Sequence, residues 1–247
     1  MRFLGCLFAL IAVLVTVPSS ALAQEFSITL GDDGSLSARA IQLILLLTIL
    51  SLVPGLAIMI TCFPFMVTVL AILRQGIGLQ QSPPNMLIVS LALFLTYFVM
   101  EPVFSKAWNA GAQPLIDGAI SPEVAFQNAM APFRAFMSGR INSETMATLA
   151  SLRPDVETEG LANDPGNAPL SVLIPSFLLS EIERAFQIGF LIFLPFLIID
   201  LVVAAVLMSM GMMMVPPAIV SLPFKLAFFV VADGWSLVSG ALVRSYF

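Results

Sequence analysis

The sequence predicts an all-α membrane protein, and two observations support this fold class. The first is composition: 59% of the 247 residues are hydrophobic and only 10% are charged, whereas soluble globular proteins carry about 25% charged residues. The second is the length of the apolar runs, which cover 41–73, 86–104 and most of 185–232. Runs of this length are typical of helices that lie in or against a bilayer, so we expect membrane-associated helical hairpins.

Missing residue types exclude several classes of function. The chain has no histidine, which removes the commonest metal ligand and the usual general base. Its net charge is −5 and it has no basic cluster, which argues against nucleic-acid binding. We find no nucleotide-binding glycine pattern, no zinc spacing and no serine with a suitably placed base. We therefore expect no enzyme, no cofactor and no metal.

Residues 1–23 have the features of a cleavable signal peptide. Arg2 supplies a positive start, an apolar stretch follows, and Ala21-Leu22-Ala23 is a small-x-small site that predicts cleavage after Ala23. The alternative is an uncleaved first membrane helix, but the short apolar stretch and the Ala-x-Ala site favour cleavage. Cys6 would leave with the signal, so the mature chain would have no internal disulfide.

The rest of the chain divides into four segments. A polar lead-in covers 24–40, a first helical hairpin 41–104, a polar and partly helical extracytoplasmic segment 105–170, and a second hairpin 171–247. A helix over 41–73 would be longer than the bilayer core is thick, so we expect it to bend, tilt or protrude, with Pro54-Gly55 and Pro64 as the natural kink points. Glu101-Pro102 predicts the end of a helix.

Three signals organise the polar segment. Ser121-Pro122-Glu123 predicts a helix start, with an N-cap serine, proline at the first position and an acid in the first turn. Phe126, Met130, Phe133 and Met137 follow at helical spacing and predict an amphipathic helix. A second short helix is expected from Asn142-Ser143 to Leu152, and the acidic stretch 153–169 is expected to be a loop.

The distribution of basic residues conflicts with ordinary membrane spanning. With a cleaved signal, Arg74 lies inside, whereas outside lie Arg39, Lys106, Arg134, Arg140, Arg153, Arg184 and Arg244. This is the reverse of the positive-inside rule. Either the signal is not cleaved, or the hairpins pack mainly against protein partners rather than lipid, which is the interpretation we favour.

Two ionisable residues interrupt the apolar part of the second hairpin. A carboxylate in the middle of a membrane helix costs about 2.5–3.5 kcal/mol, so Asp200 needs a partner, water or a proton. Lys225 is the obvious partner within the chain; the alternatives are an inter-subunit bond and a proton relay. A relay is disfavoured because Asp200 is an isolated acid without histidine. We interpret Glu181, Glu183 and Arg184 as a solvated helix start.

A short turn in the second hairpin is exceptionally rich in methionine. The stretch LMSMGMMMVPP places five methionines between two apolar runs: Met208, Met210, Met212, Met213 and Met214. Methionine is unbranched and packs against irregular shapes. The cluster is therefore either filler in a buried turn or a deformable contact surface, and a seal would require several copies arranged as a ring.

Long motifs in both hairpins resemble the FliP family of flagellar type III export-gate proteins. They read LRQGIGLQQSPPNMLIVSLALFLTYFVMEPVF and AFQIGFLIFLPFLIIDLVVAAVLMSMGMMMVPPAIVSLPFKLAFFVVADGW, and the resemblance covers 41–115 and 171–247. Family members commonly show a polar residue followed by arginine where this chain has Pro64-Phe65. Any contact made by that arginine, and the bend expected at Pro64, therefore do not follow from the resemblance.

The resemblance implies a function. It implies a ring of several copies in the bacterial inner membrane, largely on its periplasmic side, completed by two smaller partners of the FliQ and FliR type. Unfolded flagellar proteins would pass through the channel, with Met208, Met210, Met212, Met213 and Met214 as a gasket and Asp200 and Lys225 at inter-subunit contacts. The alternatives are the equivalent subunit of a virulence secretion system and a small-solute transporter, the latter disfavoured because no repeat is visible.

Overall fold

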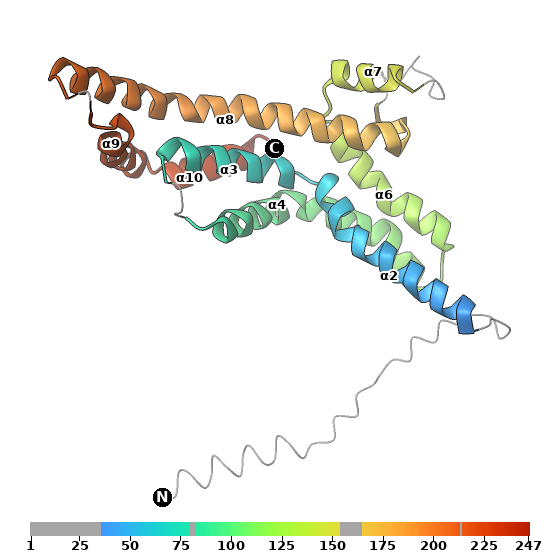
Figure 1. The fold of residues 1–247 in the computed structure, drawn as a ribbon. Helices are drawn as coiled ribbons and strands as arrows, with labels where there is room; N and C mark the ends of the chain where they lie inside the picture. The colour runs from blue at the N-terminus through green and yellow to red at the C-terminus, as the bar shows by residue number, and fades with distance from the viewer. Residues whose placement is uncertain (1–35, 80–82, 154–164, 213) are drawn as a thin grey trace, which may run out of the picture. The chain divides into compact units, whose positions relative to one another are not determined.

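The computed structural model describes residues 36–79, 83–153, 165–212 and 214–247. The expected signal segment with its cleavage site after Ala23, most of the lead-in 24–40, the greater part of the acidic loop and Met213 lie outside the described residues. The chain divides into two compact units, Met1–Ile49 and Leu50–Phe247. The described residues form helices and contain no strand, as the sequence predicts (Figure 1).

The first apolar run forms two helices, α2 (Leu36–Met59) and α3 (Phe63–Ile77). Pro54, one of the two expected kink points, lies inside α2, which continues through it as a helix. The chain leaves helical geometry at residues 60–62 instead, and Pro64 occupies the first turn of α3, where a missing N–H is harmless. Thr61 supports the break, since its hydroxyl accepts a hydrogen bond from the Phe63 N–H at 3.4 Å.

The second apolar run forms α4 (Asn85–Ala107), a π-helical turn η1 (Trp108–Ala112) and the short α5 (Gln113–Ile116). The expected helix end at Glu101-Pro102 is wrong, because Pro102 lies inside α4. One proline removes a single backbone hydrogen bond, which a long packed helix tolerates. The regular geometry of α4 ends at Ala107, where η1 begins and packs against α6.

The polar segment contains α6 (Pro122–Ser138) and α7 (Ser143–Ser151), and both predicted helix starts are confirmed. The Asn142 side chain accepts a hydrogen bond from the Glu144 N–H at 3.0 Å. The amphipathic face of α6 is only partly as expected, since Met137 is fully buried and Phe126 is 61% exposed. The first half of α6 packs against η1 through alanines, so Phe126 is not part of that contact.

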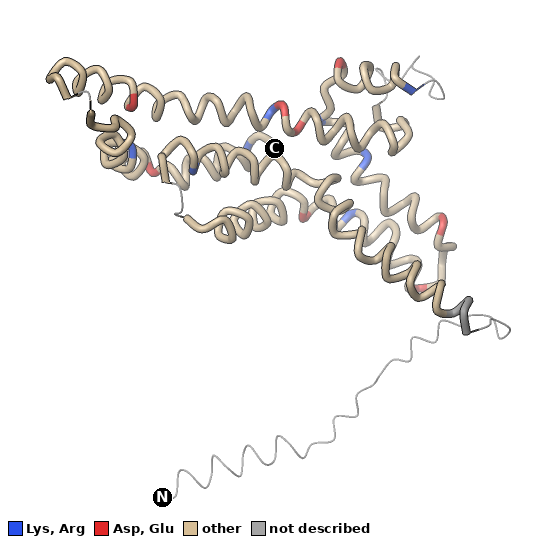
Figure 2. Tube along the Cα trace, in the orientation of Figure 1, with Lys and Arg blue, Asp and Glu red and all other residues tan. Residues whose placement is uncertain are grey.

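The last three helices are α8 (Leu170–Ser209), α9 (Pro217–Val231) and α10 (Gly234–Arg244). The 40 residues of α8, at about 1.5 Å each, extend about 60 Å. The described residues contain three helices long and apolar enough to cross a membrane, or four if α9 and α10, bent by 61°, form one span. Figure 2 shows long charge-free stretches along α8.

The core of the second unit forms around α3, which packs against α8, α4 and α9. Its buried residues recur at helical spacing, namely Phe65, Met66, Val69, Leu70, Leu73 and Ile77. Gly189 permits the close approach of α8, because a Cβ at this position would lie 2.4 Å from Ile72 Cδ1. A second core joins α6 and α7 to the first turns of α8 around Met137, Met146 and Phe177.

Gly111 sets the contact between η1 and α6. A Cβ added there would lie 2.6 Å from the Ala125 carbonyl oxygen and 2.6 Å from Ala129 Cβ. Both atoms belong to the framework of α6 and cannot rotate away. We therefore expect Gly111→Ala to lower the free energy of unfolding by about 1–3 kcal/mol, measured by thermal unfolding in detergent.

Gly139, at the C-terminal end of α6, is the matched control. A Cβ there meets nothing closer than 3.6 Å, so Gly139→Ala should be neutral or slightly stabilising. Equal stability of the two variants would contradict the packing described for Gly111.

Candidate functional site

The methionine turn begins with a capped helix end. Gly211, with φ of 75°, ends α8 in the left-handed conformation. The Met212 N–H donates to the Leu207 carbonyl and the Gly211 N–H to the Met208 carbonyl, both at 3.0 Å. This pair of bonds is a Schellman motif, which satisfies carbonyls that the helix end would otherwise leave free. The end of α8, up to Met212, is thus held by backbone hydrogen bonds.

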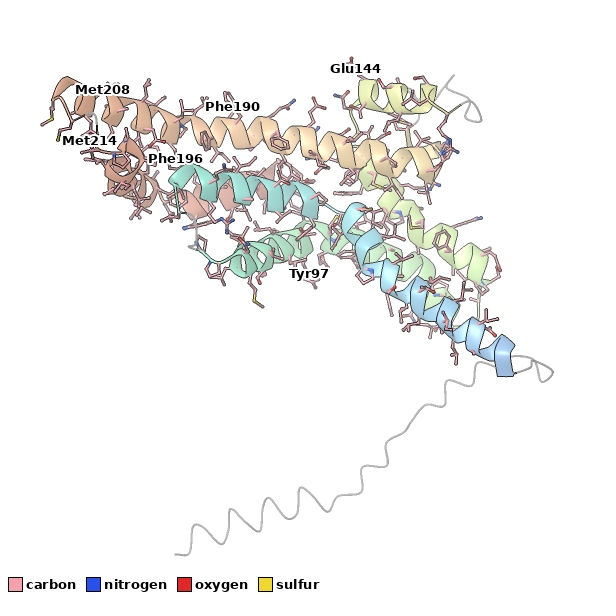
Figure 3. The ribbon with its side chains drawn as sticks, viewed as in Figure 1. Tyr97, Glu144, Phe190, Phe196, Met208 and Met214 are labelled. Atoms are coloured by element: carbon pink, nitrogen blue, oxygen red, sulfur yellow. The ribbon has the colours of Figure 1, made fainter. Side chains whose placement is uncertain are left out.

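The methionine side chains point away from this backbone. The exposed fractions of the four described residues are 59% for Met208, 65% for Met210, 38% for Met212 and 98% for Met214. Met208 and Met214 lie at the end of the α8–α9 hairpin (Figure 3). Within one chain these residues do not fill a buried turn, so their thioethers are available to other molecules.

Asp200 and Lys225 meet across the same hairpin. Lys225 Nζ lies 2.6 Å from Asp200 Oδ2, and the Ser221 hydroxyl donates to Asp200 Oδ1. The Lys225 side chain is only 7% exposed, whereas that of Asp200 is 38% exposed. The pair therefore ties α8 to α9 about 14 Å along α8 from its end, and one side of the carboxylate remains open.

An apolar groove of about 550 Å³ lies between α8 and α9 beside this ion pair. It extends to Met210 in the methionine turn. Its lining consists of Ile198, Ile199, Val202, Val203, Val206, Leu207, Met210, Val220 and Phe224. The α8–α9 hairpin thus combines exposed methionine side chains at its end, an apolar groove, and the partly exposed carboxylate of Asp200.

Glu181 corrects the sequence interpretation of its region. It was expected in a solvated helix start, but its side chain is fully buried eleven residues into α8. Arg140 Nε lies 3.0 Å from Glu181 Oε1, and the Tyr246 hydroxyl donates to Glu181 Oε2. Glu183 is exposed and bonds to Asn142 and Gln187, as a solvated position would.

Arg140 connects this cluster to the last residues of the chain. Its Nη1 donates to the Ser245 carbonyl at 2.7 Å, and its guanidinium carbon lies 3.8 Å from the centre of the Tyr246 ring. Burial and the neighbouring Glu181 charge raise the pKa of Tyr246. Two partners of Glu181 are 41 and 65 residues away, and no local pattern reveals them. A third, Arg184, is one turn further along α8, with its Nη1 3.9 Å from Glu181 Oε1. The signal in the sequence is the largely apolar stretch SVLIPSFLLS directly before this acid.

Cys62 lies in the break between α2 and α3 and is completely buried. Burial raises the pKa of its thiol to about 12, because an apolar surrounding disfavours the thiolate. The thiolate is the reactive form, so this cysteine should be inert in the folded protein. Within the described residues, no group of three or more acids, cysteines or histidines could hold a metal ion.

The reactivity of Cys62 provides a direct test of this core. At pH 8 we expect maleimide to leave Cys62 unmodified in the folded protein, because only about one thiol in ten thousand is ionised at a pKa near 12. Denaturation should expose the thiol and permit complete modification, read by mass spectrometry. Labelling at the same rate before and after denaturation would place Cys62 at the surface.

Removing Arg140 tests the buried charge cluster. Arg140→Met leaves the buried Glu181 carboxylate without its hydrogen-bonded cation, since the partly exposed Arg184 remains only at 3.9 Å, and we expect a loss of about 3–5 kcal/mol in the free energy of unfolding. Adding Glu181→Gln should recover part of this loss, because a neutral amide needs no counter-charge. Thermal unfolding measures both, and the exposed Glu183→Gln is the control. A cost for Arg140→Met no larger than that of the control would show that Glu181 is not buried as a charged group.

The sequence model of the FliP family matches residues 46–242. The flagellar biosynthetic protein FliP of Caulobacter vibrioides is 48% identical over 244 residues, which cover 96% of this chain and 90% of that protein. FliP of Agrobacterium fabrum is 46% identical and covers 96% and 97%, and that of Bacillus subtilis is 45% identical and covers 87% and 96%.

Proposed function

Because the chain belongs to the FliP family, we propose that it is a channel-forming core subunit of the flagellar type III protein export apparatus. In this role it passes unfolded flagellar proteins across the bacterial inner membrane. Relatives named as flagellar biosynthetic proteins support the flagellar reading over the virulence system. The partners are further copies of the chain in a ring, two smaller proteins of the FliQ and FliR type, and the exported proteins.

The exposure of the methionine turn is the observation that carries this proposal. Four described methionines protrude from a capped helix end, and their side chains are between 38% and 98% exposed among the described residues. One turn cannot surround a polypeptide, but several copies in a ring can bring their turns together. Unbranched thioethers then close the channel when it is empty and conform to different extended chains when it is occupied. Met213 belongs to this gasket by its sequence position.

The proposed location accounts for the reversed charge distribution. If much of the assembly lies on the periplasmic side and is covered by protein, the positive-inside rule does not apply to its hairpins. The length of α8 agrees with this arrangement, since about 60 Å is twice the hydrocarbon thickness. Asp200 then meets a neighbouring copy through its open side, while Lys225 holds its other oxygen.

Replacing all five turn methionines with alanine tests the gasket. We expect small-ion leakage across the membrane to rise while the assembled complex persists, because alanine cannot span the gap that thioethers fill. Secretion of flagellar proteins would be measured in the same cells. Met86→Ala is the matched control, since Met86 is 81% exposed but lies at the start of α4. Absence of leakage with normal secretion would place the closure elsewhere.

A further inference from the structure

The outer side of α4 carries a row of exposed aromatic side chains. Phe94, Tyr97 and Phe98 are 65%, 64% and 57% exposed, and Trp108 at the start of η1 is 53% exposed. Tyr97, Phe98 and Trp108 follow Phe94 by three, four and fourteen residues, which places all four on one side of the helix. Tyr97 marks this side in Figure 3. The aromatic row is therefore an unpartnered face of the second unit.

Glu101 interrupts the aromatic row near its centre. It is exposed, and among the described residues no hydrogen bond or ion pair reaches its carboxylate. Contact with lipid would cost this charge about 2.5–3.5 kcal/mol. Contact with water would leave the aromatic rings as a large exposed apolar patch. A protein surface that offers both apolar contact and a cation satisfies the rings and the carboxylate together.

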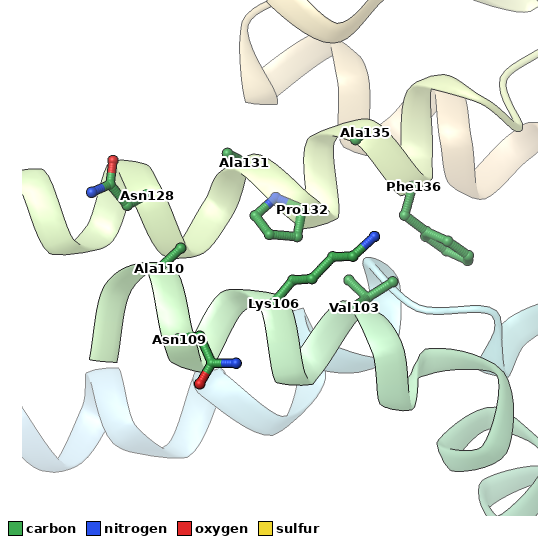
Figure 4. A pocket seen from close by; sticks show the side chains of 9 residues that line it. All are labelled: Val103, Lys106, Asn109, Ala110, Asn128, Ala131, Pro132, Ala135 and Phe136. Carbon is green, nitrogen blue, oxygen red and sulfur yellow. The ribbon is translucent and has the colours of Figure 1, made fainter. Parts of the chain in front are cut away.

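The same chain offers such a surface between α4 and α6. A groove of about 830 Å³ is lined by apolar side chains, two amides and one ammonium group. Figure 4 shows Lys106 extending along this groove toward Phe136, whereas Asn109 and Asn128 lie at the opposite end of the groove. In the part of the chain that the structure describes, Lys106 has no ion pair. The groove thus offers the apolar contact and the cation that the aromatic row and Glu101 lack.

One copy cannot make this contact with itself. Glu101 and Lys106 are five residues apart, which separates them by about 140° around α4. Side chains at this spacing do not face each other on a helix, in contrast to those three or four residues apart. An acid on one face and a cation on another suit a heterologous, head-to-tail contact, and such contacts generate rings.

We propose that the aromatic row of one copy docks into the α4–α6 groove of the next copy, with Glu101 paired to the neighbour's Lys106. This inference rests on the proposed function only in requiring several copies of the chain. A second copy is favoured over a different partner because both complementary halves occur on this one chain. The contact adds to the hairpin contacts and fixes which faces meet around the ring.

Charge reversal tests the pairing. The full chain would be expressed with its export-apparatus partners, extracted in detergent, and its assembly measured by native mass. We expect Glu101→Lys or Lys106→Glu alone to lower the assembled fraction at least about tenfold, because like charges then face each other. The double variant Glu101→Lys/Lys106→Glu should restore assembly. Glu144→Lys is the control, since Glu144 is exposed on α7, away from both surfaces.

Each other outcome has one meaning. Single variants that assemble like the wild type, or a double variant that stays defective although its Cys62 remains protected from maleimide, overturn the pairing. Where a reversal variant does not accumulate, Glu101→Gln and Lys106→Gln replace it, and both must weaken assembly to a similar extent. A wild-type chain that never forms multimers would instead refute the proposed function, so the two failures are distinguishable.

Discussion

The length of α8 is the constraint on which the other features depend. At about 60 Å it is twice as long as the hydrocarbon core is thick, so lipid alone cannot cover it. Around the beginning of α8 pack α6, α7 and the last residues of the chain. In its middle, Gly189 allows α3 to lie close. At its end the chain turns back as α9, which packs against it. The helix therefore acts as a rod that fixes the distance between the Glu181 cluster and the methionine turn.

The two carboxylates on α8, those of Glu181 and Asp200, differ in their burial and in their partners. Glu181 is fully enclosed and both of its oxygens are occupied, by Arg140 and by Tyr246. A buried charge satisfied in this way specifies one arrangement of the surrounding helices, since loss of either partner leaves a costly group. Asp200 is satisfied by Lys225 and Ser221 but remains partly open. A carboxylate has room for further donors, so this site can hold its own hairpin and also accept a neighbour.

The methionine turn combines a fixed backbone with adaptable side chains. The Schellman motif at Gly211 and the Asp200–Lys225 bond hold the hairpin end, while the thioethers extend freely from it. This division of roles suits a contact that must be placed accurately and yet fit changing shapes. The aromatic row of α4 has the opposite character, because rigid rings and one charge favour a single, permanent partner.

Features that depend on neighbours in the sequence could be predicted from the sequence, as the starts of α6 and α7, the all-α class and the methionine turn show. The resemblance to the FliP family could likewise be recognised from the sequence, because its motifs are continuous stretches of residues. Desolvation alone indicated that Asp200 needs a partner, with Lys225 as the candidate. The continuation of α4 through Pro102, the break at 60–62 and the burial of Glu181 were decided only by the tertiary structure. Their energies come from contacts between helices far apart in the chain, such as the 65-residue separation of Glu181 from Tyr246, and no local pattern encodes those.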